Sequence, residues 1–456
     1  MSTALPFRPF AGLAVAVVGL GRAGLPAALR LVEWGADVTA WDDGAEARAA
    51  AEVAGLALRD LREGAFRFDA LLLSPGIPHR LPKPHPIAAR ATGLGVPVLC
   101  DVEFLTAALR AAGATPLIAG ITGTNGKSTT TALLHHILVS AGWRAEAGGN
   151  LGTAALSLPL LGEGQAYVLE MSSYMLERLA RTRFNAAVML NLSPDHLDRH
   201  GDMAGYAAAK AQIFARQDHT DIAVIGQDDG ARALAVGLHA RTIPISGTTP
   251  QPGGVWAEAG VLRDDSGAIL DLRETLALHG DHNAQNAAAA AAVALTWGVA
   301  RGDLAEGLMT YPGLPHRAER VGTLDGIPWI NDSKATNADS TARALATWGR
   351  VVLIAGGTGK EGGIDSLAPL FGHIAHAVLI GRDGPAFAQT LAAHGVPHTI
   401  AGTLAAAIPA ARDAARTTGA EAVLLSPAAA SWDQFTGFDA RGDAFRAAVQ
   451  ALEEQP

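Results

Sequence analysis

The sequence has few features of secreted, membrane-spanning or nucleic-acid-binding proteins. It contains one cysteine, Cys100, in 456 residues, so neither a disulfide framework nor a cluster of thiolate metal ligands can form within the chain. Acidic residues outnumber basic ones and the formal net charge is -9, which argues against a general binder of nucleic acid or of anionic membranes. No run of 18 apolar residues occurs, so we expect neither a transmembrane helix nor stable membrane insertion.

Hydrophobic residues make up 49% of the chain, which is enough for a large core, and the length corresponds to two or three domains. The early stretch "AGLAVAVVGLG" imitates a signal peptide, but no small-residue cleavage pattern follows it. We therefore expect a cytoplasmic protein, and a monomer.

Short apolar runs alternate with helical patterns, which predicts parallel sheets covered by helices on both faces. The sequence predicts an α/β fold with three domains. These are a Rossmann-like domain over residues 1–112, a central P-loop mononucleotide-binding α/β domain over 113–312, and a Rossmann-like α/β domain over 313–456. The main predicted strands lie within 13–21, 37–43, 70–78, 97–105, 165–173, 186–196, 221–229, 328–333, 351–357, 376–381 and 421–427. A long buried helix is predicted at 281–298, and a linker at 310–320.

The stretch "GITGTNGKSTT" (120–130) follows a short apolar run and precedes a helical pattern. It varies the pattern G-x-x-x-x-G-K-[ST], because Ile121 stands where the first glycine is usual. Backbone N–H groups of such a loop can surround a phosphate, Lys127 can reach the β- and γ-oxygens, and a hydroxyl of Ser128 or Thr129 can bind Mg²⁺. The alternative is an ordinary glycine-rich turn with a capping hydroxyl.

A second glycine loop, "GLGRAG" (19–24), also lies between a strand and a helix, and Asp42 follows at the end of the next strand. Alone, this motif would indicate NAD(P), but physically it indicates only a pyrophosphate near a helix N-terminus. The turn "SPGIP" (74–78) ends a strand that should face the same crevice.

Polar residues at other strand ends and helix starts add further candidates. Glu170 ends a strand and can bind Mg²⁺ or cap the next helix, and His196 follows another strand end, where a structural role is the alternative. Asn283 and Asn286 share one helix face and suit amide contacts near adenine, with capping by Asn283 as the alternative. From the sequence alone Lys210 is a solvated helix lysine. Asp195, Asp198, Arg199 and His200 are expected to be local caps and surface charges.

Seven motifs occur in one order: "GTNGKST", "EMSSYMLE", "LNLSPDHLDRH", "HNAQN", "PHRAE", "NDSKATN" and "SPAAASWDQFTGFDARG". In these motifs and their order, the chain resembles the Mur ligases of peptidoglycan synthesis. The resemblance extends over nearly the whole chain and is strongest to the Mur ligases that add D-glutamate. The resemblance implies that ATP phosphorylates the alanine carboxylate of UDP-N-acetylmuramoyl-L-alanine. The amine of D-glutamate then attacks the acyl phosphate, and phosphate leaves.

The resemblance also implies roles for individual residues. It implies ATP contacts by Gly123, Thr124, Asn125, Gly126, Lys127, Ser128, Thr129, Asn283, Asn286, Arg317, Asp332 and Lys334. It implies a Mg²⁺ site formed by Ser128, Glu170, His196 and a carbamylated Lys210, and catalytic roles for Lys127, His196 and Lys210. For Arg317, Asp332 and Lys334, the alternative is an interdomain salt bridge.

For the uridine nucleotide, the expected contacts are Gly19, Arg22, Ala23, Asp42, Asp43, Ser74, Gly76 and Asn150. For D-glutamate they are Thr336, Lys360, Ser431 and Phe438. The first glycine loop, "GLGRAG" (19–24), departs from the family's "GLGLTG" version at Arg22 and Ala23. Ala23 lacks the hydroxyl of the family's threonine, and Arg22 is expected to replace the contact that this hydroxyl makes. Thr358 replaces an acidic residue of the family's "GGDGK" loop.

Three other functions are compatible with parts of the sequence. A sister Mur ligase would use another amino acid and present different groups at Thr336, Lys360 and Ser431. An NAD(P)-dependent oxidoreductase would explain "GLGRAG" but not "GTNGKST". A non-catalytic nucleotide-binding module would show no turnover of ATP stimulated by an amino acid.

Overall fold

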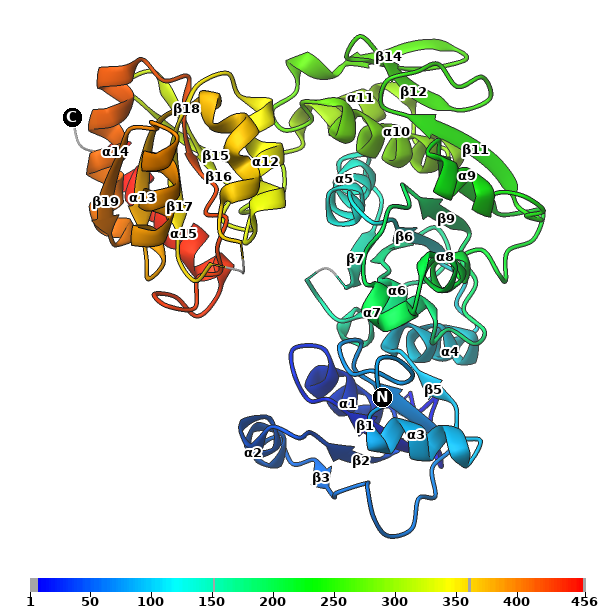
Figure 1. The fold of residues 1–456 in the computed structure, drawn as a ribbon. Coiled ribbons are helices and arrows are strands. Elements are labelled where there is room, and N and C mark those ends of the chain that lie inside the picture. The colour runs from blue at the N-terminus through cyan, green and yellow to red at the C-terminus, as the bar shows by residue number, and fades with distance from the viewer. Residues whose placement is uncertain (1–6, 151, 360–361, 454–456) are drawn as a thin grey trace, which may run out of the picture. The chain divides into compact units, whose positions relative to one another are not determined.

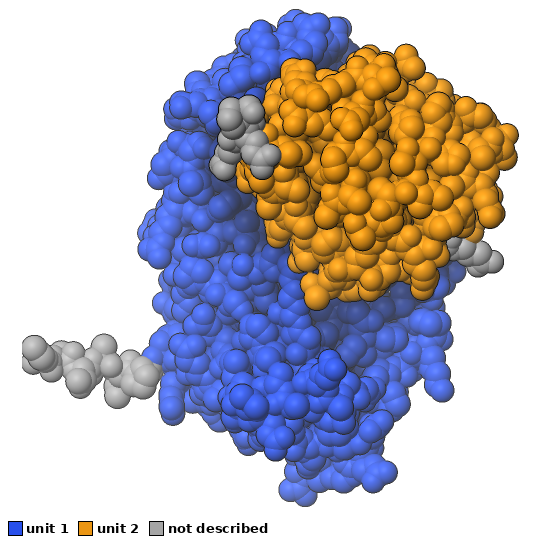
Figure 2. Space-filling view, turned by 90° about the vertical axis from the view of Figure 1, so that its left-hand side faces the viewer, with its two compact units in different colours: residues 1–311 blue, residues 312–456 orange. Residues whose placement is uncertain are grey.

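The computed structural model describes residues 7–150, 152–359 and 362–453. The chain divides into two compact units, Met1–Tyr311 and Pro312–Pro456, which Figure 2 shows in different colours. In the described residues the first unit contains two sheets and the second unit contains one. Figure 1 labels their elements.

The N-terminal sheet is parallel throughout, with strand order β3-β2-β1-β4-β5. The order reverses between β1 and β4, and in such sheets ligands bind beyond the carboxyl ends of the strands at this point. Both glycine-containing turns of this domain, 19–24 and 74–78, follow these two strands. The strands are β1 (Ala14–Val18), β2 (Asp37–Trp41), β3 (Ala57–Leu58), β4 (Ala70–Leu73) and β5 (Val98–Leu99), and the helices are α1 (Gly24–Glu33), α2 (Ala45–Val53), α3 (Pro86–Gly93) and α4 (Asp101–Ala112).

The central sheet has the order β14-β13-β12-β11-β10-β9-β6-β8-β7 and is parallel from β7 to β12. Its strands are β6 (Leu117–Thr122), β7 (Ala145–Gly149), β8 (Ala166–Glu170), β9 (Ala186–Met189), β10 (Ile222–Gly226), β11 (Arg241–Ser246), β12 (Val255–Glu258), β13 (Val261–Asp264) and β14 (Gly267–Asp271). The helices are α5 (Lys127–Ser140), α6 (Ser173–Leu176), α7 (Leu197–His200), α8 (Met203–Ala211), α9 (Asp229–Leu234), α10 (Asp281–Thr296) and α11 (Arg301–Thr310), with 3₁₀ turns η1 (Ala155–Ser157) and η2 (Leu272–Glu274).

Helix α10 confirms the expectation of a buried helix. Its alanines from Ala287 to Ala294 are buried, interrupted only by the buried Val293. Because alanine side chains are short, α10 can lie close against α5, the helix that follows the phosphate loop (Figure 1).

The sheet of the second unit has the order β15-β16-β20-β17-β18-β19, and only the β15–β16 pair is antiparallel. Its strands are β15 (Glu319–Leu324), β16 (Ile327–Asn331), β17 (Val351–Gly356), β18 (Ile374–Ile380), β19 (His398–Gly402) and β20 (Ala422–Leu425). The helices are α12 (Ala338–Thr347), α13 (Gly384–Ala393), α14 (Leu404–Thr418) and α15 (Phe438–Glu453), with the 3₁₀ segment η3 (Asp365–His373).

The α/β prediction is confirmed by these three sheets. Cys100 is buried at the N-terminus of α4, and burial raises the pKa of its thiol to about 12. No helix in the described parts of the chain is both long enough and apolar enough to cross a membrane.

Candidate active site

The phosphate loop lies between β6 and α5, and its path requires glycine at two points. Gly126 is the N-cap of α5 with a φ of 86°, and Gly123 has a φ of 156°. A Cβ atom on Gly126 would collide with the Oδ1 atom of Asn286, and one on Gly123 would crowd Leu190. The loop therefore brings its backbone close to neighbouring elements and leaves the first N–H groups of a 14-residue helix at its end, where an anion is favoured.

The side chain of Asn191, two residues after β9, holds the loop. The amide N–H of Asn125 donates to Asn191 Oδ1 at 2.8 Å, and Asn191 Nδ2 donates to the carbonyl of Asn125 at 3.2 Å. Sequence reasoning missed Asn191. Strand β9 pairs in parallel with β6, so the carboxyl ends of these strands meet at the same edge, and that signal could have identified it.

Two lysines approach the loop. Lys127 Nζ donates to the carbonyls of Gly123 and Thr124, each at 2.9 Å. Lys210 Nζ donates to the carbonyl of Gly123 at 2.8 Å and to Thr122 Oγ1 at 3.2 Å, and it lies over the ring of Tyr206. The expectation that Lys210 is solvated was wrong, because its side chain is only 1% exposed. Burial, reinforced by the Lys127 ammonium, lowers the pKa of Lys210 to about 6.

The two asparagines of α10 lie under the loop. Asn286 is buried, accepts a hydrogen bond from Thr130 Oγ1 and donates one to Asn283 Oδ1. Asn283 in turn donates to the carbonyl of His279 at 3.0 Å. The N-cap of α10 is Gly280, so Asn283 is not the cap residue. The adenine contact of both residues stays a prediction, while Asn286 contacts the first turn of α5 and Asn283 is linked to that turn through Asn286.

Glu170, at the end of β8, has the properties expected of a cation ligand. Its side chain is buried, and Oε1 accepts a hydrogen bond from Asn150 Nδ2 at 2.6 Å. Its Oε2 atom is buried without a hydrogen-bond partner in the described structure. A buried carboxylate oxygen in this condition costs free energy, which a bound cation would remove.

His196 has a φ of 52° at the start of α7, and its half-exposed ring contacts Tyr174. Within residues 7–150, 152–359 and 362–453, no group of three or more His, Cys, Asp or Glu side chains could hold a metal ion. A hard cation here would therefore depend on hydroxyl, phosphate or modified-lysine oxygens as well as Glu170, which suits Mg²⁺.

The seven predicted N-terminal residues of the uridine site all line one cleft of about 530 Å³. Asp42 accepts hydrogen bonds from the backbone N–H groups of Leu20 and Gly44 at 2.6 and 2.7 Å. Ser74 donates to the carbonyl of Gly19 at 2.8 Å, which joins the two turns. Arg22 donates to the carbonyl of Gly152, two residues after Asn150. The cleft is lined by Val18, Gly19, Gly21, Arg22, Ala23, Asp42, Asp43, Ser74, Pro75, Gly76, Ile77, Pro78 and His85.

Two residues expected to be local caps or surface charges make contacts with other segments. His200 is buried, with Nε2 at 2.9 Å from Ser173 Oγ, and burial lowers its pKa. Arg199 donates to the carbonyl of Gly76, in the wall of the cleft, at 3.0 Å. Asp195 confirms its local role, because its Oδ1 accepts a hydrogen bond from the N–H of His196.

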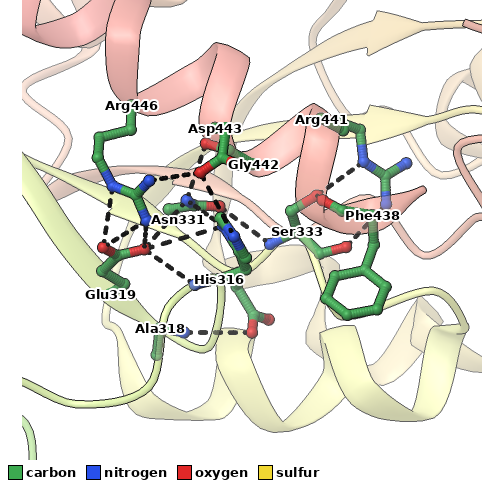
Figure 3. Close-up of polar contacts among 11 residues, drawn as sticks. His316, Ala318, Glu319, Asn331, Ser333, Phe438, Arg441, Gly442, Asp443 and Arg446 are labelled. Atoms are coloured by element: carbon green, nitrogen blue, oxygen red, sulfur yellow. Dashed lines mark hydrogen bonds and ion pairs between the residues drawn. The ribbon is translucent and has the colours of Figure 1, made fainter. Parts of the chain in front are cut away.

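In the second unit, the segment that carries Arg317 is fixed to β16 and α15 by the polar network of Figure 3. Asn331 Nδ2 lies 3.0 Å from His316 Nδ1 and donates to the carbonyl of Gly442 at 3.1 Å. The N–H of Ala318 donates to Asp332 Oδ1 at 3.2 Å, and the N–H of Lys334 donates to the carbonyl of His316 at 3.1 Å. Burial raises the pKa of Asp332 to about 6. Arg317, Asp332 and Lys334 are thus held by one set of contacts.

Arg441, which sequence reasoning missed, connects the segments that carry the predicted D-glutamate residues that the structure describes. The buried Arg441 guanidinium donates to Ser333 Oγ, to the carbonyl of Ser333 and to the carbonyl of Ala429, at 2.9, 2.8 and 3.1 Å. Ser333 Oγ donates to the carbonyl of Phe438 at 2.7 Å (Figure 3). Arg441 thereby joins the segments that carry Thr336, Ser431 and Phe438. Lys360 lies outside the described residues.

Thr358 pairs with Ala430, the neighbour of Ser431, in an isolated antiparallel β-bridge. The ring of Phe438 lies 5.0 Å from Lys334 Nζ. In the second unit, the segments that follow β16 and β20 therefore carry Asp332, Lys334, Thr336 and Ser431.

The family models for the Mur ligase middle domain and for the Mur ligase glutamate ligase domain match residues 121–294 and 316–429. The UDP-N-acetylmuramoylalanine--D-glutamate ligase of Caulobacter vibrioides (strain NA1000 / CB15N) is 47% identical, over 98% of each chain. The protein of the same name from Paramagnetospirillum magneticum is 48% identical, over 97% of each chain. The chain belongs to the Mur ligase family.

Both of these relatives, which match over almost their full length, are named UDP-N-acetylmuramoylalanine--D-glutamate ligase. Solved structures agree on the three-domain Mur ligase fold. The UDP-N-acetylmuramate-alanine ligase MurC from Thermotoga maritima aligns with a TM-score of 0.59 at 18% identity, over 96% of this chain and 100% of that one. The MurF ligase from Thermotoga maritima, in complex with ADP, aligns with a TM-score of 0.55 at 16% identity, over 97% and 96%.

Proposed function

We propose that the chain is an ATP-dependent ligase that joins D-glutamate to the alanine carboxylate of UDP-N-acetylmuramoyl-L-alanine, in the synthesis of peptidoglycan precursors. The observation that carries the proposal is the identity of 47–48%, across almost the whole chain, to ligases named for that reaction. The phosphate loop and the cleft lined by the predicted uridine residues support it independently of those names.

The reaction has two steps. A carboxylate oxygen of the alanine forms a bond to the γ-phosphorus of ATP while the bond to the β–γ bridging oxygen breaks, which yields an acyl phosphate and ADP. The neutral amine of D-glutamate then adds to the acyl carbon, phosphate leaves, and the nitrogen loses a proton. Both steps need cations around the phosphate oxygens and the exclusion of water.

The first unit supplies the phosphate-binding groups. The N–H groups of residues 123–129 bind the β-phosphate, and Lys127 moves from its carbonyl partners to the phosphate oxygens. Asn286 lies close to the loop at Gly126, and Asn283 and Asn286 contact the adenine. Arg317 and Lys334 bring positive charge to the γ-phosphate, and Asp332 binds the ribose.

Ser128, Glu170, His196 and a carbamylated Lys210 would hold Mg²⁺. When bound, the ion neutralises the charge that develops on the phosphate oxygens. The unpartnered Oε2 atom of Glu170 supports this assignment.

The uridine nucleotide binds in the cleft, with Asn150 toward the sugar diphosphate. The residues of the cleft that bind it are Gly19, Arg22, Ala23, Asp42, Asp43, Ser74 and Gly76. Thr336, Lys360, Ser431 and Phe438 bind D-glutamate.

The decisive experiment measures phosphate release from ATP with UDP-N-acetylmuramoyl-L-alanine, offering D-glutamate, L-lysine, meso-diaminopimelate or L-alanine in parallel. We expect release with D-glutamate alone. Release with another amino acid would indicate a sister ligase and overturn the roles of Thr336, Lys360 and Ser431. No release with any of the four would contradict the ligase activity, and binding of NADH would then favour an oxidoreductase.

Carbamylation of Lys210 has a separate test. Since its pKa is about 6, the amine is neutral at pH 7.5 and can add to CO₂. We expect activity to fall several-fold in CO₂-depleted buffer and to return with bicarbonate, and Lys210→Ala to be insensitive to bicarbonate. Equal activity of the wild type with and without CO₂ would refute the modification.

A further inference from the structure

The turn that follows β4 forms one wall of the uridine cleft, and two arginines of the central domain hold it. Arg178 donates to the carbonyls of Leu73, Ser74 and Ile77, at 2.8, 3.0 and 2.5 Å. Arg199 donates to the carbonyl of Gly76 at 3.0 Å and makes a longer contact of 3.4 Å with that of Pro75. Five consecutive carbonyls, residues 73–77, are thus bound by two guanidinium groups.

Within the turn, the N–H of Ile77 donates to the carbonyl of Ser74 at 3.0 Å, and the two arginines add five contacts to the turn's carbonyls. Pro75 and Pro78 lack N–H groups, so the turn has few internal donors. Arg178 is 2% exposed and lies two residues beyond α6, and burial lowers its pKa only to about 10, so it remains charged at neutral pH. Hydrogen bonds from a buried charged donor are among the stronger ones in proteins.

Neighbouring ionisable and aromatic side chains connect the segments that carry the two arginines, and Arg178 Nε lies 3.5 Å from His79 Nδ1. Glu177 Oε1 lies 3.2 Å from His79 Nδ1, just beyond the turn, while Glu177 Oε2 lies 3.6 Å from His200 Nδ1. The guanidinium of Arg199 lies over the ring of Tyr174 at 4.2 Å. The turn, α6 and α7 are therefore joined by a connected set of polar and cation–π contacts.

The arginines belong to segments that begin at the predicted metal-side residues. Arg178 is eight residues after Glu170, and Arg199 is three residues after His196. On the other side, Ser74 connects the held turn to Gly19 of the first glycine loop through its hydroxyl. Short chain segments and hydrogen bonds thus connect Glu170 and His196, the predicted metal-side residues, to the first glycine loop, which is proposed to bind the uridine diphosphate.

We propose that Arg178 and Arg199 are positioning residues for the uridine nucleotide: they set the 73–77 wall of its cleft. This inference rests on the proposed function. Neither guanidinium needs to contact the nucleotide, because both act through main-chain carbonyls.

Arg199→Ala tests the proposal without emptying a buried site, since Arg199 is only partly buried. We expect its KM for UDP-N-acetylmuramoyl-L-alanine and its dissociation constant for UDP, measured by calorimetry, to rise roughly tenfold. The KM values for ATP and D-glutamate, and kcat, should change by less than about twofold, because the lost contact affects only the nucleotide's cleft. Arg199→Lys, which keeps one charged donor, should fall between Arg199→Ala and the wild type.

Arg216→Ala is the matched control. Arg216 is also partly buried and also donates to backbone carbonyls, those of Leu179, Ala180 and Gln212, but to none in the cleft wall. It should leave UDP binding unchanged. Arg178→Lys is the second variant, and its folding is checked by thermal unfolding before UDP binding is measured.

Equal UDP binding by the wild type, Arg199→Ala and Arg178→Lys would overturn the inference while leaving the proposed function intact. An equal loss in Arg216→Ala would also overturn it, because the effect would then be general destabilisation. A wild type that binds neither UDP nor the UDP-linked substrate would overturn both.

Discussion

The phosphate loop, residues 123–128, and the segment 316–334 of the second unit both carry predicted ATP contacts, but they are held in shape differently. The loop depends on backbone conformations that only glycine adopts easily, on amide contacts from Asn191 and on the close approach of Asn286, and its carbonyls also accept hydrogen bonds from Lys127 and Lys210. The segment depends on buried or half-buried ionisable groups, among them His316, Asp332 and Arg441. The first kind of support should fail when a methyl group is added, the second when a charge or a donor is removed.

The segment also carries backbone strain that glycine does not relieve. His316 and Ala318 have φ values of 63° and 45°, on either side of Arg317. Such conformations persist only where the surroundings fix them, and the contacts of Figure 3 do this. Arg446 adds an ion pair to Glu319 at 2.8 Å.

The largest effect should come from Gly126→Ala, which adds a methyl group to the loop. The new Cβ would collide with Asn286 at a backbone angle that alanine adopts with strain, so the loop must move. We expect ATP turnover to fall roughly 100-fold, as displacements of about 1 Å can cause. Isothermal titration with ATP and the phosphate-release assay measure it.

Gly142→Ala is its control, because Gly142 lies just beyond the other end of α5 with a similar φ of 82° and no atom within 4 Å of an added Cβ. The Gly142→Ala variant should have the same backbone strain as Gly126→Ala but should keep its ATP binding. If both variants bound ATP equally, the loop would not depend on close approach of its backbone.

Arg441→Met should have the next largest effect, this time on stability. It leaves the carbonyls of Ser333 and Ala429 and the hydroxyl of Ser333 without their buried donor. We expect the second unit to lose about 3–5 kcal/mol of unfolding free energy, measured by urea denaturation. Arg416→Met removes an exposed ion pair with Asp325 and should leave the transition unchanged. Equal shifts in the two variants would contradict the role given to Arg441.

Asp332→Asn should have the smallest effect, and it should depend on pH. Because burial raises the pKa of the folded carboxyl from 3.8 to about 6, its contribution to stability is fully present below pH 3.8 and is lost as the pH rises through about 6. The difference between these two pKa values corresponds to at most about 3 kcal/mol of unfolding free energy. Thermal unfolding should therefore show the variant more stable than the wild type at pH 8, and equal to it near pH 4. A gain that is the same at both values would exclude the carboxyl as its source.

The sequence motifs predicted the parts of the site that depend on backbone conformation. The glycine loops, the strand ends at Ser74 and Glu170, and the α/β layering could all be identified from local patterns. The wrong predictions concern side chains whose partners come from distant segments. Buried Lys210 contacts Gly123, buried His200 contacts Ser173, and Arg199 reaches a turn 123 residues before it. No local pattern distinguishes a solvated arginine from one that satisfies the carbonyls of another domain.

The single thiol of the chain has a practical consequence. Cys100 is buried and its pKa is about 12, so it carries almost no thiolate at neutral pH and should resist alkylating dyes and spin labels. The protein is therefore ready for labelling at introduced cysteines without first replacing its own. A pair placed at exposed sites such as Val53 in the first unit and Trp432 in the second would report, by fluorescence transfer, how their separation responds to each substrate.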